Sequence, residues 1–76
     1  MEIKTTTGEI FAGPSAKAIV LQMARGDFVA HGKWDYMKEV QERLKAAYDL
    51  LITIEHGNYE YFLAELERVG RITRMD

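Results

Sequence analysis

Turn-forming and helix-capping residues divide the first 26 residues into short segments, and this constrains the fold more than any other feature. Residues 2–6 and 9–12 are rich in Thr, Ile and Phe, which favour strands, and a glycine between them favours a tight turn. Pro14 ends the second strand because it lacks an N–H, and Ser15 is a typical helix N-cap. Gly26 can take the left-handed conformation in which many helices end. The segment therefore predicts a β-hairpin followed by an amphipathic helix.

The remaining residues predict two more helices and one or two more strands. Residues 26–34 have no clear period and are interpreted as a loop, after which Asp35 is expected to cap the second helix. Residues 50–54, Leu-Leu-Ile-Thr-Ile, are typical of a strand, and Asn58 is expected to cap the third helix. Residues 71–75 form a short last strand or an extended tail. Apolar stripes identify the expected core, which comprises Ala16, Ile19, Val20 and Met23, then Met37, Val40, Leu44, Ala47 and Tyr48 or Leu51, and finally Phe62, Leu63, Leu66 and Val69.

Together these elements predict a single α+β domain over residues 1–76, in the order ββααβα with a further β-strand or tail at the end. The helices are expected to cover one face of a small antiparallel sheet, because that arrangement buries every apolar stripe at once. A chain of 76 residues is too short to enclose a second core. It contains no cysteine, so no disulfide adds to the stability of so small a core, and formation of a homo-oligomer is left open.

The charge of the chain is weakly acidic, with a formal net charge of -2. This gives no general attraction to nucleic acids or to acidic membrane surfaces. The longest apolar run, residues 18–21, is far too short to span a bilayer, and the first four residues do not resemble a secretory signal. We therefore expect a cytoplasmic protein with no membrane partner.

Residues that commonly perform catalysis or hold metals are few and scattered. The two histidines, His31 and His56, lie in separate predicted loops, whereas a metal site needs three or four convergent ligands. Ser15 is the only serine, and its capping role accounts for it. The sequence therefore predicts neither a metal nor a cofactor, and no enzymatic activity.

Two basic regions support alternative binding functions. A helix start offers unpaired N–H groups to an anion, and arginines from elsewhere could complete such a site. The candidate anion-binding residues are Ser15, Lys17, Arg71 and Arg74. The ligand would be a cyclic or adenine nucleotide, bound across an oligomer interface. Residues 68–74 are also a candidate for contacting DNA phosphates, although arginines at a helix end also stabilise the helix dipole.

The aromatic stretch 27–36 is the feature that most suggests a protein partner. Trp and Tyr are favoured at interfaces because they are large, amphipathic and rigid. The candidate contact residues are His31, Lys33, Trp34 and Tyr36, of which Trp34 is expected to be the most exposed. A second, acidic candidate patch, expected to face water on the third helix, consists of Glu60, Glu65 and Glu67. Such a patch could mimic nucleic acid, although simple occlusion of a partner's surface is favoured.

The sequence Thr-Gly-Glu-Ile-Phe-Ala-Gly-Pro-Ser at residues 7–15, followed by Ile-Val-Leu-Gln-Met at 19–23, resembles small uncharacterised proteins of phages and mobile elements. Tyr36-Met37 and Phe62-Leu63 are similar to their central and C-terminal segments, and the departures lie in residues 26–34. The resemblance implies a cytosolic protein that occupies a surface of a host protein, as inhibitors of bacterial immunity do, anti-CRISPR proteins among them. It therefore implies a stoichiometric inhibitor of a host defence complex. The alternatives are a nucleotide sponge and a DNA-binding regulator.

Overall fold

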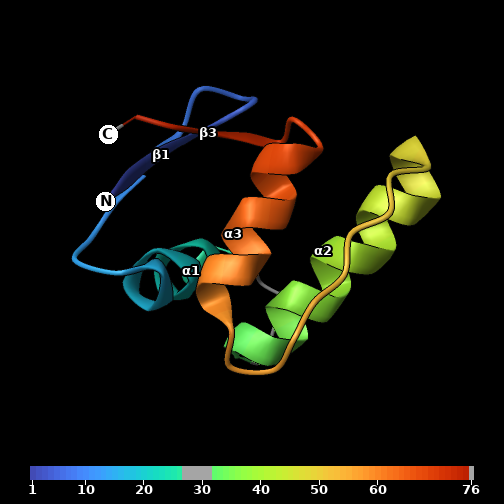
Figure 1. The fold of residues 1–76 in the computed structure, drawn as a ribbon, viewed down its shortest axis with the longest axis horizontal. Helices are drawn as coiled ribbons and strands as arrows, with labels where there is room; N and C mark the ends of the chain where they lie inside the picture. The colour runs from blue at the N-terminus through green and yellow to red at the C-terminus, as the bar shows by residue number, and fades with distance from the viewer. Residues whose placement is uncertain (27–31, 76) are drawn as a thin grey trace.

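The computed structural model describes residues 1–26 and 32–75. The elements of the described chain, in order, are β1 (Glu2–Thr5), β2 (Ile10–Ala12), α1 (Ala16–Arg25), α2 (Lys33–Tyr48), α3 (Tyr59–Arg68) and β3 (Ile72–Arg74). The strands form an antiparallel sheet in the order β2-β1-β3, and the three helices lie on one side of it (Figure 1). The predicted α+β class is therefore confirmed, including the N-terminal hairpin and a last strand.

β1 is the central strand of the sheet and pairs with β2 on one side and β3 on the other. Ile3 lies opposite Phe11 in β2 and opposite Arg74 in β3. Because side chains alternate across a strand, Ile3 enters the core while its neighbour Lys4 faces solvent. The outward-facing side of the sheet includes Ile10, which is 56% exposed.

α1 begins as the sequence predicts. The hydroxyl of Ser15 accepts a hydrogen bond from the amide of Ala18 at 3.2 Å. The helix ends at Gly26, but this residue has φ of -81°, so the prediction of a left-handed conformation there was wrong. Its amide instead bonds the carbonyls of Met23 and Ala24, which closes the last turn without a change of handedness.

α2 begins earlier than predicted. Its N-cap is Gly32, which has φ of 144°, and no side chain caps the helix. Lys33 and Trp34 therefore belong to α2 instead of a loop, and Asp35 lies in the first turn, where a negative charge stabilises the helix dipole. The rest of the predicted loop, residues 27–31, lies outside the described residues. At the other end Asp49 takes a left-handed conformation, φ 56°, and the chain turns back along α2.

Residues 50–54, which we call the strap, form no strand. Both edges of β1 are already occupied by β2 and β3, so the strap has no place beside the central strand. It runs along α2 on the helical side of the molecule (Figure 1). The predicted strand at this position was therefore wrong, although burial alternates along residues 51–54 as it would in a strand.

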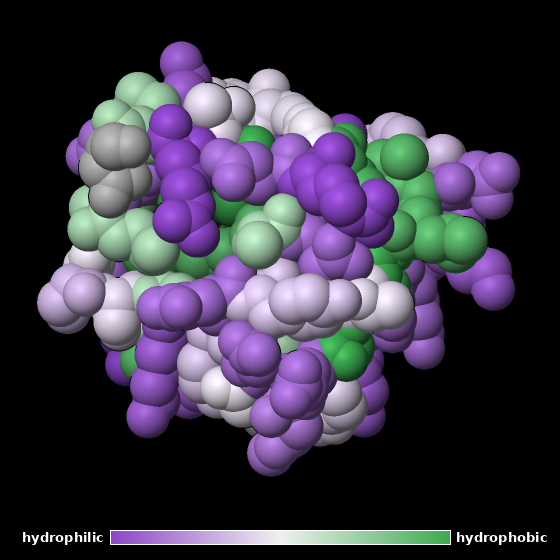
Figure 2. Space-filling model, in the orientation of Figure 1, coloured by the Kyte–Doolittle hydropathy of each residue, from purple (hydrophilic) through white to green (hydrophobic). Residues whose placement is uncertain are grey.

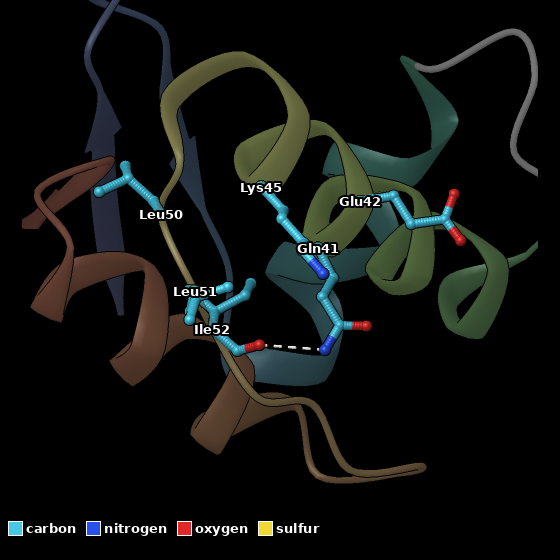
Figure 3. Close-up of a pocket in the computed structure, with 6 residues that line it drawn as sticks. All are labelled: Gln41, Glu42, Lys45, Leu50, Leu51 and Ile52. Atoms are coloured by element: carbon cyan, nitrogen blue, oxygen red, sulfur yellow. Dashed lines mark hydrogen bonds between the residues drawn. The ribbon is translucent and has the colours of Figure 1, made fainter.

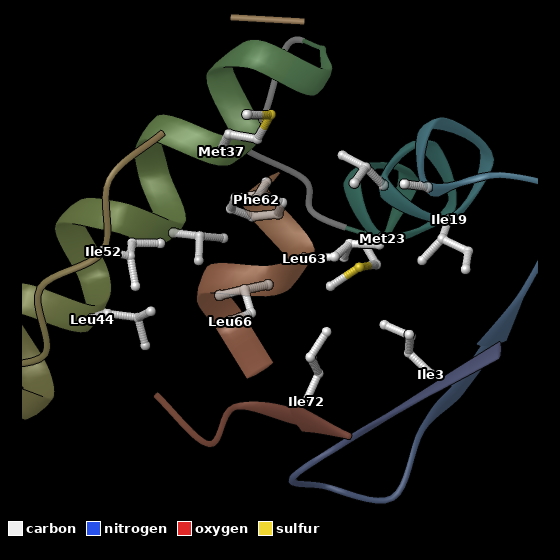
Figure 4. Close-up of a cluster of buried hydrophobic side chains, with 13 residues drawn as sticks. Ile3, Ile19, Met23, Met37, Leu44, Ile52, Phe62, Leu63, Leu66 and Ile72 are labelled. Carbon is white, nitrogen blue, oxygen red and sulfur yellow. The ribbon is translucent and has the colours of Figure 1, made fainter. Parts of the chain in front are cut away.

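The core lies between the sheet and the helices, and α3 occupies its centre (Figure 4). Phe62 and Leu63 are fully buried and contact side chains from the other elements. Most of the predicted core is confirmed, with corrections at four residues: Ala47, Tyr48 and Leu51 are exposed and Val69 is only half-buried. The buried face of α2 ends at Leu44, beyond which the helix extends past the core and its last turn faces solvent.

Candidate functional site

The strap is held in place by side chains from both flanking helices. The Nε2 of Gln41 in α2 donates to the carbonyl of Ile52 at 3.0 Å. From α3, an Nη2 of Arg68 donates to the carbonyl of Leu51 at 2.8 Å, and Glu65 accepts from the amide of Thr53 at 3.0 Å. The carbonyl groups of successive residues in an extended segment point to opposite edges. The side chains of α2 and α3 therefore form hydrogen bonds with opposite edges of the strap.

Glu65 is the centre of this network. It is 9% exposed, and its carboxylate pairs with Arg68 at 2.6 Å while it accepts from both the amide and the hydroxyl of Thr53. The same hydroxyl hydrogen-bonds to Tyr61. The bond from Arg68, followed by that from the Thr53 amide, lowers the pKa of Glu65 from 4.5 to about 2. The network satisfies a buried charge and fixes the strap.

Because neighbouring side chains of the strap point in opposite directions, one of its large apolar side chains faces solvent. Ile52 is 4% exposed, whereas Leu51 is 66% exposed. Tyr48, the last residue of α2, is 54% exposed. Three residues span at most about 11 Å, so both side chains lie at the same end of α2. We call Tyr48 and Leu51 the apolar tip.

A groove of about 340 Å³ lies beside the apolar tip, between α2 and the strap (Figure 3). Leu50, Leu51 and Ile52 form its apolar side, and Gln41, Glu42 and Lys45 of α2 form its polar side. The space-filling view shows apolar side chains gathered where α2 ends and the strap begins (Figure 2). Contiguous exposed apolar surface rimmed by polar groups is typical of a protein contact site.

The predicted aromatic contact residues lie at the opposite end of α2 and are largely structural. Trp34 is half-buried. Its ring lies edge-on to the ring of His56, with 5.0 Å between the two ring centroids. Nζ of Lys38 lies 5.6 Å from the centroid of the Trp34 ring. Tyr36 is also half-buried and packs against Phe62. Trp34 was expected to be the most exposed of the candidate contact residues, but in the first turn of α2 it packs against the core and is half-buried, as are Lys33 and Tyr36. Lys33 lies above the ring of Tyr59, and His31 is outside the described residues.

The predicted acidic patch is not continuous on the surface. Glu60 is exposed in the first turn of α3, and Glu67 lies 3.9 Å from Arg74 near β3. Glu65 was expected to face water but is buried against the strap, since it lies on the same side of α3 as Leu66 and Phe62. The three carboxylates therefore do not form a continuous acidic surface that could mimic the phosphate backbone of a nucleic acid.

The four candidate anion-binding residues are not brought together in one copy of the chain. Ser15 and Lys17 border a shallow depression of about 280 Å³ beside the first turn of α3. Arg71 lines a separate cleft against α2, and Arg74 is near Glu67. Within the described residues, no group of three or more side chains is placed to hold a metal ion, and no helix is long and apolar enough to cross a membrane.

Sequence reasoning missed the apolar tip and the side chains that fix the strap. A signal was present in the consecutive apolar residues 50–52, because neighbouring side chains of an extended segment point to opposite sides. The partners Gln41, Glu65 and Arg68 had no such signal, since polar residues on helices are usually solvent-exposed. Comparison with known proteins adds no further candidates: no family model, curated protein or solved structure matches the chain.

Proposed function

We propose that the chain is a small protein-binding module that acts stoichiometrically by covering a surface of its partner. The observation that carries this is the exposure of Leu51 and Tyr48 at one end of α2, beside an apolar groove. A partner could bury the exposed apolar surface of both side chains, which makes them suitable anchors. The apolar tip, and not the Trp34 region, is the proposed contact face.

The resemblance to phage and mobile-element proteins supports a more specific form of the proposal. The partner would be a host protein in the cytoplasm, and binding would block a defence complex. The nucleotide-sponge alternative requires a second copy of the chain, because its four residues lie at separate places in one copy. DNA binding through residues 68–74 has less support, because Arg68 is engaged with Glu65 and the strap.

The test is affinity capture from bacterial host lysate with wild-type protein and two matched variants. Leu51→Asp places a charge on the apolar tip, and Ile10→Asp makes the same change on the outer face of the sheet, at a residue of similar exposure. We expect wild type and I10D to recover the same protein in equimolar amounts, and L51D to lose it by at least tenfold. Thermal unfolding of each variant checks that the fold is retained.

Equal recovery of the partner by L51D and wild type would remove the apolar tip as the contact face. Loss with I10D alone would move the contact to the sheet. If wild type recovers no protein above background from a host panel, the binding function itself is contradicted.

A further inference from the structure

A second concave surface lies on the side of α2 that faces the sheet. It is a cleft of about 250 Å³ between the turn of the β1–β2 hairpin and the last turns of α2. Apolar side chains form its floor and hydroxyl groups its rim, and these include Val40, Leu44, Leu66, Ile72, Thr5 and Thr7. Tyr48 lines this cleft and lies three residues before Leu51, so the cleft and the apolar tip lie at the same end of α2.

Arg71 is the distinctive residue of this cleft. It is half-buried, and its guanidinium carbon lies 4.5 Å from the centroid of the Tyr48 ring. Within residues 1–26 and 32–75, no carboxylate forms an ion pair with Arg71, and no hydrogen bond uses its guanidinium. The N–H groups of this partly buried guanidinium can therefore donate hydrogen bonds to an acceptor on another molecule.

The other charged residues that line the cleft have partners within the chain, so Arg71 is the one that can bind an external acceptor. Arg43 is paired with Glu39 at 2.7 Å. Glu9, the cleft's carboxylate, accepts from the hydroxyl of Thr7 at 3.1 Å. With one unpaired cation and one carboxylate on the rim, the cleft suits a singly charged carboxylate better than a doubly charged phosphate.

We propose that this cleft receives an acidic side chain of the protein partner, bound by Arg71 and flanked by apolar side chains that cover Tyr48 and Leu51. The proposal rests on the proposed function and specifies the chemistry of the partner segment. A protein segment is favoured over a free organic acid because the cleft and the apolar tip share Tyr48, so one chain can cover both. Planar guanidinium groups bind carboxylates in a two-point geometry, which would give such contacts specificity as well as strength.

The test is an NMR titration of isotope-labelled protein with two blocked peptides, acetyl-Leu-Glu-Leu-amide and acetyl-Leu-Gln-Leu-amide. We expect the Glu peptide to shift the Nε–Hε signal of Arg71 and the ring signals of Tyr48, and to bind at least about tenfold more tightly than the Gln peptide. Arg71→Gln should abolish this preference. Lys4→Gln removes the same charge from the outer face of the sheet and should leave the preference intact.

Equal binding of the two peptides, or an equal effect of K4Q and R71Q, would overturn the proposal, because attraction would then be non-specific. Binding of 4-phenylbutanoate as tightly as the Glu peptide would identify a site for free organic acids, and competition by inorganic phosphate would identify an anion site. The proposed function is judged separately: capture that is lost with L51D but kept with R71Q supports the apolar tip and rejects the role of Arg71.

Discussion

The carboxylate of Glu65 connects α3 to the strap through several hydrogen bonds. It accepts from the amide and hydroxyl of Thr53 and from two nitrogens of Arg68, and Arg68 in turn donates to the carbonyl of Leu51. Such a charge is stabilising only while its donors remain, because an unpaired buried charge is costly. The position of Leu51 on the surface therefore depends on a residue that lies beneath it.

Replacing Glu65 tests this dependence. Glu65→Gln keeps the size of the side chain but removes the charge, and we expect it to lower the free energy of unfolding at pH 7 by about 1–3 kcal/mol. Because the fold stabilises the charged form, with a pKa of about 2 against 4.5, this contribution is complete above pH 4.5 and is lost as the pH falls towards 2. The difference between wild type and E65Q in urea unfolding should therefore shrink across that range.

Glu42→Gln is the matched control, since Glu42 is exposed on α2 beside the groove. We expect it to change stability by no more than about 0.5 kcal/mol. A difference between wild type and E65Q that stays constant from pH 7 to pH 2 would contradict the assigned role of the carboxylate.

At the level of elements, the strap is a segment that pairs with no described strand. The amide of Leu50 donates to the carbonyl of Leu44 in α2, and side chains of α2 and α3 bond the backbone of residues 51–53. The adjacent strap residues Leu51 and Ile52 differ sharply in burial. Substituting each in turn therefore distinguishes the strap's contribution to stability from its contribution to partner binding. Ile52→Ala should lower the free energy of unfolding by about 2–4 kcal/mol, because it leaves a cavity beneath the strap. Leu51→Ala should change it by no more than about 0.5 kcal/mol.

Urea unfolding of the two variants is the measurement. Similar losses of stability in I52A and L51A would mean that the strap does not alternate as described. Partner capture should show the reverse pattern, in which L51A weakens binding while I52A, where it remains folded, retains it.

The strap also shows what the sequence could and could not predict. Its residue types predicted a strand, and the capping residues Ser15 and Asn58 predicted where two helices begin. Residue types do not identify the pairing partner, however, and here three helical side chains take the place of a strand. Trp34 was misplaced for a related reason: with Gly32 as N-cap, α2 starts before the first residue that looks like a cap. The apolar tip follows from these long-range contacts, so the sequence alone did not locate it.

For the whole molecule, α3 is the element on which the other layers pack. Phe62 is fully buried; in the core cluster it lies among side chains of α2 and the strap on one side and of α1 and the sheet on the other (Figure 4). A domain of 76 residues buries a smaller fraction of its surface than a larger one and is stabilised correspondingly little. One large side chain at this position is therefore a substantial share of the total stability, which for proteins is about 5–15 kcal/mol.

Phe62→Ala is expected to cost about 3–5 kcal/mol, which is as much as one core supplies in a domain of this size, so much of the protein should be unfolded at 25 °C. Circular dichroism should show the loss of a cooperative thermal transition, and differential scanning calorimetry the loss of its heat absorption peak. Ile10→Ala, on the outer face of the sheet, should melt close to wild type because its side chain is already mostly in water. An F62A variant that melts within a few degrees of wild type would mean that the layers are stabilised separately. In that case α3 would not be the element that holds the strap, and with it the apolar tip, to the sheet.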